Sequence, residues 1–350
     1  MIPRLGTLTQ GRANNVQLLR LLAASFVVVF HSYALTGRWT SEPLWKLAPE
    51  LNFGVVGVKI FFVLSGFLVT QSWLARRHAK SFVAARVLRI YPALFAATVF
   101  TMLLAGVSSA LPWGSFLSHP QTWDYAWRVA LGWDMVYRLP GAFPTNPFPH
   151  DVNGSLWTLP IELRLYVALL LAGVVGLIAH RLVWLVTVGA LTIAFILRPE
   201  WLPFAPNDRV VLELALLFAL GSLACAFRDA IPVSLAGLVM VVALVAWNPG
   251  GLTRATYFAP LLAYAVLVLA YHPRLQWPWF RRVGDYSYGV YVYSFPIQQT
   301  LMQRLPDLEP VGLLLMSLPL SIAVAFASWH ALEQPALRLK SRFTRETDIR

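Results

Sequence analysis

Long apolar runs alternate with short polar segments along almost the whole chain. An α-helix needs about 20 apolar residues to cross the hydrocarbon core of a bilayer, and ten of the runs reach or approach that length. The pattern therefore predicts an all-α fold, a polytopic transmembrane helical bundle. The ten expected helices cover residues 17–35, 54–73, 88–107, 155–178, 183–198, 209–227, 232–247, 255–271, 285–303 and 311–330.

The composition is that of a membrane protein. Of the 350 residues, 58% are hydrophobic and 13% are charged, whereas a soluble domain is usually about 45–50% apolar. We therefore expect one membrane-embedded domain over residues 1–350. The net charge of +12 indicates cytoplasmic loops rather than a nucleic-acid partner. Cys225 is the only cysteine, which excludes an internal disulfide bond.

The positive charges predict how the helices are oriented. When both termini are placed in the cytoplasm, 18 of the 28 Lys and Arg residues fall on the inner side, as the positive-inside rule requires. Residues from about 332 to 350 then form a basic cytoplasmic tail. The inner residues are Arg4, Arg12, Arg20, Arg76, Arg77, Lys80, Arg86, Arg89, Arg181, Arg228, Arg274, Arg281, Arg282, Arg338, Lys340, Arg342, Arg345 and Arg350.

Two ionisable residues interrupt the first apolar run. Arg20 and His31 are eleven positions apart, which on an α-helix puts them on nearly the same face and about 16 Å apart along the axis. Ionisable groups at membrane depth are costly unless they face a partner or a cavity, so this stripe is a candidate functional site. The alternative is structural: Arg20 extends to the interface, and His31 bonds to a neighbouring helix.

The first inner loop is the densest basic segment, ARRHAKSFVAARVLRIYP. Arg86 and Arg89 are three residues apart and so are neighbours on one helical face. Paired guanidinium groups match the oxygens of a phosphate, so this face is a candidate phosphate site. Orientation in the membrane and attraction to anionic lipid headgroups explain the same charges equally well.

Two further segments carry polar or aromatic side chains. Glu162 enters an apolar run just after Pro160, and a carboxylate there needs a partner, either Arg164, an arginine of another helix or His31. A purely structural ion pair is the alternative. The outer segment 108–153 contains four tryptophans. Residues 121–137 are expected to form a helix lying in the membrane interface, with sugar stacking as the alternative use of its rings.

Several kinds of catalytic motif do not occur in the sequence. We find no glycine-rich phosphate loop, no cluster of metal ligands and no Ser-His-Asp arrangement with family spacing. The sequence therefore predicts no metal site. Any chemistry is expected to depend on the ionisable residues within the helices.

Six stretches together resemble the acyltransferase-3 family of integral membrane acyltransferases, and they occur in family order: LLRLLAASFVVVFHS, GVKIFFVLSGFLV, ARVLRIYPAL, GSLWTLPIELRLY, YSYGVYVYSFPI and ALEQPALR. The resemblance implies transfer of an acyl group, commonly acetyl, from cytoplasmic acyl-coenzyme A to sugars at or beyond the outer membrane face. The family's Arg-x10-His motif falls on Arg20 and His31, its Arg-x-x-Arg motif on Arg86 and Arg89, and the acid of its LWTLPIE motif on Glu162.

One position departs from the family pattern. The stretch YSYGVYVYSFP is similar to a segment that often carries histidine where this chain has Ser294. Because serine does not titrate near neutral pH, an acid–base role for this position is not expected here.

The residues and the resemblance together give one hypothesis. Acyl-coenzyme A, commonly the acetyl form in the family that the chain resembles, docks its phosphates on Arg86 and Arg89. His31, with an unperturbed pKa near 6.5, acts as general base or carries the acyl group transiently, and Glu162 or Arg20 orients the imidazole. The expected acceptor is an exopolysaccharide, an O-antigen or a related glycan, and the expected location is the inner (cytoplasmic) membrane, with polysaccharide-assembly proteins as partners.

Two other classes of protein fit the same residues. In a transporter of a lipid-linked glycan or of the acyl donor, they would form a substrate or proton path. A non-catalytic partner of a polysaccharide synthase would need them only for structure. Consumption of the thioester by the purified protein separates the enzyme from both alternatives.

Overall fold

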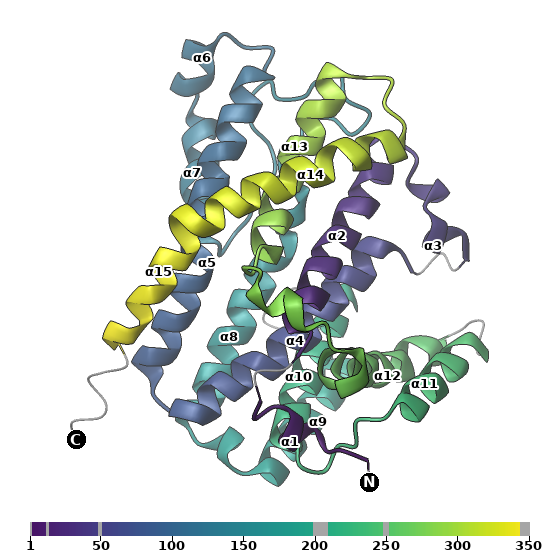
Figure 1. Cartoon of the computed structure of the whole chain (residues 1–350). Coiled ribbons are helices and arrows are strands. Elements are labelled where there is room, and N and C mark those ends of the chain that lie inside the picture. The colour runs from purple at the N-terminus through teal and green to yellow at the C-terminus, as the bar shows by residue number, and fades with distance from the viewer. Residues whose placement is uncertain (1, 12–13, 48–50, 199–208, 248–251, 344–350) are drawn as a thin grey trace. The chain divides into compact units, whose positions relative to one another are not determined.

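The computed structural model describes residues 2–11, 14–47, 51–198, 209–247 and 252–343 (Figure 1). Among these residues the regular structure is helical, and no β-strand is formed. Extended pairing in the described chain is limited to isolated bridges such as Ser109 with Ala142 and Arg138 with Asp151. The predicted all-α architecture is confirmed. Residues 344–350 of the expected basic tail lie outside the described residues.

A helix lies at each of the ten expected positions. They are α2 (Val16–Leu35), α4 (Phe53–Arg76), α5 (Ala79–Val107), α8 (Leu159–Val174), α9 (Arg181–Leu197), α10 (Arg209–Ala226), α11 (Leu235–Trp247), α12 (Leu252–Tyr271), α13 (Ser287–Arg304) and α14 (Pro310–Ser328). Short helices connect or extend them: α1 (Leu5–Leu8), α3 (Pro43–Leu47), α6 (Trp113–Ser118), α7 (Pro120–Leu131) and α15 (Gln334–Arg338).

Not all of these helices are equally suited to a membrane. By length and composition, five helical segments of the described chain are able to cross one: Val16–Leu35, Phe53–Arg76, Ala79–Val107, Gly154–Val174 and Pro310–Phe343. Four shorter apolar helices are Arg181–Ala194, Val210–Ala226, Leu235–Leu244 and Phe258–Tyr271. The protein is therefore a multi-pass membrane protein by its helices. The count of ten spans and the cytoplasmic placement of both termini stay predictions.

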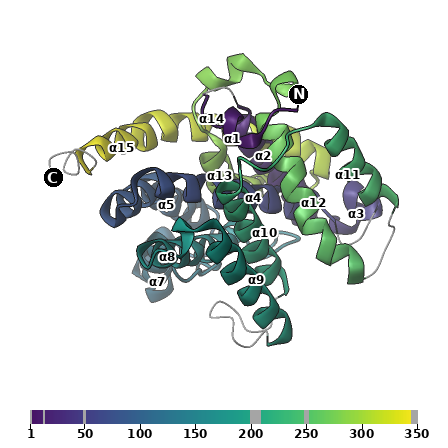
Figure 2. The same ribbon diagram turned by 90° about the horizontal axis from the view of Figure 1, so that it is seen from below.

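The chain divides into two compact units. The first unit comprises Met1–Arg20, Lys59–Phe82 and Arg164–Val283, and the second comprises Leu21–Val58, Val83–Leu163 and Gly284–Arg350. Within the first unit, α9 packs on α10 and α11 packs on α12, as Figure 2 shows. The candidate residues His31, Glu162, Arg86 and Arg89 all belong to the second unit, and Arg20 belongs to the first.

Small residues allow close helix packing in the first unit. A Cβ atom on Gly66 of α4 would lie 1.9 Å from the carbonyl oxygen of Phe218 on α10. These two helices therefore meet backbone to backbone, as helices in membranes commonly do. Lys59 and Glu213 form an ion pair of 2.6 Å between the same two helices, which compensates both charges at membrane depth.

α13 is the central helix of the second unit. Every residue from Ser287 to Gln299 is buried, and α14 packs along it. A Cβ on Gly289 would lie 2.7 Å from the side chain of Ala325 on α14, so glycine is needed for this approach. A helix enclosed on all sides can present polar groups only to the protein interior, and those groups form much of the candidate site.

The outer segment contains two helices, α6 and α7, that contact α5. Gly106, near the end of α5, contacts Trp113 at the start of α6, whereas the hydroxyl of Tyr91 donates to the carbonyl oxygen of Leu131 at the end of α7, at 2.9 Å. Gly106 and Tyr91 are about 22 Å apart along α5. The α6–α7 segment therefore runs alongside α5, antiparallel to it (Figure 1). A helix is thus formed over Pro120–Leu131 of the expected 121–137, and its placement in the membrane interface stays a prediction.

The predicted orientation is testable by cysteine labelling. Cys225 is 1% exposed, so we expect it to react little in the intact membrane, and its removal gives a clean background. New cysteines at the exposed positions Lys80 and Ser341 should react only with a cytoplasmic reagent, and one at Ser118 only with an external reagent. Labelling of Lys80→Cys and Ser118→Cys from the same side would refute the assignment of spans.

Candidate active site

The imidazole of His31 faces a short 3₁₀ turn, η2 (Gly154–Thr158), that directly precedes α8. Its Nδ1 atom is 3.4 Å from the Oγ of Ser155. The ring also meets Phe295 of α13 edge to face, with centroids 5.0 Å apart and planes inclined by 81°. Nδ1 therefore faces the serine hydroxyl, and Nε2 is the ring nitrogen that is available for proton transfer.

A glycine permits the approach of Phe295 to this site. A Cβ atom on Gly154 would lie 2.9 Å from the Phe295 ring, closer than atoms of a packed core approach one another. Any larger residue at position 154 would displace either the ring or the turn that carries Ser155. The glycine of the GSLW stretch therefore sets the distance between η2 and α13.

Hydrogen bonds hold η2 against α13. The hydroxyl of Tyr291 donates to the carbonyl oxygen of Ser155 and is 2.7 Å from the Oγ1 of Thr158. The side-chain amide of Asn153 donates to the carbonyl oxygen of Val292 at 2.8 Å. Because its backbone is anchored on both sides, Ser155 keeps its side chain toward the histidine.

The turn of α2 that carries His31 is also anchored. Gln298 is fully buried, and its Nε2 donates to the carbonyl oxygen of Val28 at 3.1 Å and to the Oγ of Ser32 at 2.8 Å. The same Nε2 is 3.2 Å from the Oγ of Ser317 on α14. Gln298 therefore joins three helices directly beside His31. The sequence did not single out Ser155, Tyr291, Phe295 or Gln298, although three of them lie in the motif stretches.

Arg20 lies three turns from His31 on the same helix. Both belong to α2, so the predicted common stripe is confirmed at the level of secondary structure. The guanidinium of Arg20 lies 6.0 Å from the centroid of the Phe61 ring on α4, a cation–π distance. Because about 16 Å of helix separates the two residues, Arg20 does not hydrogen-bond the imidazole. Any effect of Arg20 on the orientation of His31 is therefore expected to be indirect.

Glu162 lies in the first turn of α8, one turn after Thr158. Tyr288 and Tyr291 on α13 lie close enough to its carboxylate to be influenced by its charge. Tyr291 is the residue that anchors Ser155. Glu162 is thereby connected with the surroundings of His31 through α13.

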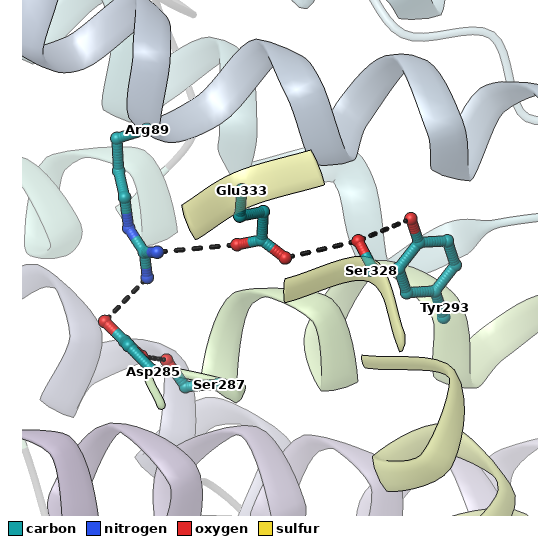
Figure 3. A network of polar contacts seen from close by, with 6 residues as sticks. All are labelled: Arg89, Asp285, Ser287, Tyr293, Ser328 and Glu333. Carbon is teal, nitrogen blue, oxygen red and sulfur yellow. Dashed lines mark hydrogen bonds and ion pairs between the residues drawn. The ribbon is translucent and has the colours of Figure 1, made fainter. Parts of the chain in front are cut away.

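Arg89 sits at the centre of a network of polar contacts (Figure 3). Its Nη2 is 2.7 Å from the Oδ2 of Asp285, and its Nη1 is 3.4 Å from the Oε2 of Glu333. Arg86 lies one turn earlier on α5 and is half-buried. The structure therefore places the two arginines of the basic segment on one helix, as predicted, and gives Arg89 two carboxylate partners that the sequence did not indicate.

Ser294 is fully buried on α13, and its hydroxyl makes no hydrogen bond to a described residue. Replacing Ser294 with alanine is therefore expected to leave most of the activity intact, because no described contact is lost. Single-turnover assays of wild type and Ser294→Ala check this expectation. A loss of more than about a hundredfold, within the range of general acid–base catalysis, would show that the hydroxyl participates.

Beyond His31 toward the expected outer side, the proline-rich loop is fixed by side-chain amides. Asn146 donates to the Oε1 of Gln299 at 2.7 Å, and Gln299 donates to the carbonyl oxygens of Phe148 and Asp151 at 2.8 and 2.7 Å. Partial burial raises the pKa of Asp151, and the nearby Arg138 opposes this effect. The loop above the site is thus attached to α13 through buried hydrogen bonds.

Comparison with known proteins relates the whole chain to one family. The acyltransferase domain family matches residues 14–330. Nodulation protein 10 of Rhizobium leguminosarum bv. viciae is 29% identical over 379 residues, covering 95% of this chain and 95% of that protein. The O-acetyl transferase of Shigella phage Sf6 is 26% identical over 344 residues, covering 94% and 98%. No solved structure matches the chain.

Proposed function

Because this chain belongs to the acyltransferase-3 family, we propose that it moves an acyl group from acyl-coenzyme A to a sugar hydroxyl of a surface glycan. Family membership makes the protein an acyltransferase, in place of a transporter or a non-catalytic partner of a synthase. The relative named O-acetyl transferase supports acetyl as the group and oxygen as the acceptor atom. The inner (cytoplasmic) membrane is the proposed location, with an exopolysaccharide or O-antigen as acceptor.

The observation that carries the proposal is the contact between His31 and Ser155. A sugar hydroxyl is a poor nucleophile at neutral pH, so transfer needs a base. With Nδ1 facing the serine, Nε2 removes the proton as the sugar oxygen attacks the thioester carbon. The carbon–sulfur bond then breaks, and the imidazolium returns the proton to the departing thiolate. The products are the sugar ester and free coenzyme A.

A transient acyl-histidine is the second route open to the same residue. In that route Nε2 itself attacks the thioester, the thiol leaves, and the sugar hydroxyl then displaces the imidazole. Mass spectrometry of the protein, mixed rapidly with donor in the absence of sugar, distinguishes the two. An acyl adduct on His31 supports the carrier route, and an unmodified protein supports the base route.

The donor is proposed to enter from the inner side. Arg86 meets its phosphates, because a guanidinium matches phosphate oxygens. Measured along α13 from Tyr288, which lies beside Arg89, to Phe295, which lies beside His31, the separation is about 10 Å. An extended pantetheine arm is long enough to cover this distance and also the helical turn that separates Arg89 from Arg86. The thioester would then reach His31 while the nucleotide stays at the inner end.

Arg20 and Glu162 stay proposed site residues with supporting roles. Arg20 lies about 16 Å along α2 from His31, so we assign it to positioning of the donor rather than to the chemistry. Glu162 lies near Tyr291, which anchors Ser155, so we assign it to the alignment of η2. The acceptor sugar is proposed to approach His31 from the side of the loop that carries Asn146 and Asp151.

The test is a transfer assay with the purified protein in liposomes. Labelled acetyl-coenzyme A and extracted glycan are supplied, and thiol release and label in the glycan are both measured. We expect equal amounts of thiol and sugar ester. Mass spectrometry of surface glycans from cells with and without the protein then identifies the acyl group. No thiol release with any acyl-coenzyme A, together with unchanged glycan masses, would refute the proposal.

A further inference from the structure

Arg89 is enclosed by four side chains from distant parts of the chain. Asp285 and Glu333 contact its two terminal nitrogens at 2.7 and 3.4 Å. The rings of Tyr288 and Trp329 lie 5.9 and 5.6 Å from the guanidinium carbon. Only 15% of the Arg89 side chain is exposed. The terminal nitrogens of the Arg89 guanidinium thus contact carboxylates. Two aromatic rings lie within cation–π distance of the same guanidinium.

This arrangement conflicts with a phosphate-binding role for Arg89. Bidentate binding of a phosphate uses two N–H groups of one guanidinium edge. Both terminal nitrogens of Arg89 already donate hydrogen bonds to carboxylates. A phosphate would therefore have to displace a largely buried ion pair. Removing one partner of such a pair is costly, because the other charge stays buried.

Both carboxylates are themselves held in place (Figure 3). Asp285 gives one oxygen to Arg89 and accepts at the other from the hydroxyl of Ser287, at 2.5 Å. Glu333, which is fully buried, gives one oxygen to Arg89 and accepts at the other from Ser328 at 3.3 Å. A carboxylate bound at both oxygens keeps one orientation. The side chains of this network therefore have little freedom to rotate. We call Arg89, Asp285 and Glu333 together the joint.

An irregular turn brings Glu333 to this joint. α14 continues as a π-helical turn, η7 (Trp329–Glu333), before α15. Such a turn contains one more residue than an α-helical turn, which shifts the direction of the side chains after it, and such turns are frequent at functional sites. The hydroxyl of Tyr293 donates to Ser328 at 3.1 Å, which ties the start of this turn back to α13.

The joint lies at the start of α13. Asp285 is two residues before Ser287, the first residue of α13. One turn later Tyr291 anchors Ser155, and one further turn later Phe295 contacts His31. A shift or rotation at the start of α13 would thus be passed along a buried helix to both neighbours of the imidazole.

We propose that Arg89, Asp285 and Glu333 are positioning residues that hold α13 against His31, so that the two arginines of the basic segment have different tasks. Arg86 binds the donor's phosphates, whereas Arg89 aligns the helix that shapes the catalytic site. This inference rests on the proposed function, in which transfer takes place at His31.

The test separates turnover from donor binding. Glu333→Gln and Asp285→Asn keep the shape of each side chain and remove its charge, and Arg89→Lys keeps the charge but cannot meet two carboxylates with one planar fork. We expect each variant to lower kcat by about tenfold to a hundredfold, the scale of a small misplacement of reacting groups. The Kd for acetyl-coenzyme A should stay within about twofold of wild type.

A double variant tests whether the residues act together. Arg89→Gln with Glu333→Gln should lower kcat no further than Arg89→Gln alone, because both changes break the same joint. Glu309→Gln is the matched control, since Glu309 pairs with Arg38 at an exposed site with 58% of its side chain accessible. We expect this control to turn over like wild type.

Two results would overturn the inference. In an active wild-type background, it fails if Arg89→Lys weakens donor binding as much as Arg86→Ala does while Glu333→Gln and Asp285→Asn turn over normally. Arg89 would then be a phosphate ligand. Absence of any transfer by the wild-type protein is a different result, which overturns the proposed function and this inference with it.

Discussion

Replacing His31 with alanine is expected to lower acyl transfer to sugar by about 10²–10⁴-fold. The variant should still fold, insert and bind acyl-coenzyme A, because the contacts of the imidazole within the described chain are one hydroxyl and the rings of Phe30 and Phe295. Without a base near the sugar hydroxyl, attack on the thioester loses its proton acceptor. Transfer rates and donor affinity, measured separately on the purified variant, check both halves of the expectation.

The pH dependence gives a second readout of the same change. The wild-type rate should rise with pH through one ionisation, as the imidazole loses its proton and becomes a base, and this rise should be absent in His31→Ala. His180→Ala is the matched control, because His180 is exposed and its side chain makes no capping hydrogen bond. Transfer by His31→Ala at the wild-type rate would end the catalytic proposal.

Replacing Arg86 with alanine is expected to weaken donor binding by about 1.5–3 kcal/mol, the scale of a lost hydrogen bond to a charged group. The physical reason is the loss of a planar fork that matches two phosphate oxygens. Lysine at this position should restore only part of the affinity, because an ammonium group is a point charge. Equilibrium binding of acetyl-coenzyme A to the variants measures the effect directly.

Arg38→Ala is the control for this second prediction. Arg38 pairs with Glu309 at an exposed site, so its loss removes a positive charge without touching the basic segment. Donor affinity should then equal that of wild type. If Arg86→Ala binds the donor as tightly as wild type, the charges of this segment serve only orientation and attraction to lipid headgroups.

The location of the helices was determined by the sequence alone. In a bilayer each spanning segment must satisfy its own backbone hydrogen bonds. A sufficiently long apolar run therefore forms a helix, which pairs these groups within the segment. That is why a helix lies at each of the ten expected ranges. The common face of Arg20 and His31 on α2, and the one-turn spacing of Arg86 and Arg89 on α5, follow from helix periodicity in the same way.

The path of the outer segment was decided by tertiary contacts. Trp123 and Trp127 are 58% and 57% exposed on α7, and a row of exposed aromatic rings suits either a helix lying in the interface or one facing lipid. The local pattern does not choose between the two. The bond from Tyr91 to the carbonyl of Leu131 and the contacts of Gly132 with Leu94 and Leu163 place α7 alongside α5.

The partners of the candidate residues also came only from the tertiary structure. Ser155 is 124 positions from His31, and the carboxylates that hold Arg89 are 196 and 244 positions away from it. Periodicity and spacing carry information over a few helical turns. Contacts at such separations depend on how buried helices pack, on a glycine that admits Phe295 and on one π-helical turn that directs Glu333 inward. The sequence therefore located the histidine and the arginines, and the packing around α13 decided which groups they meet.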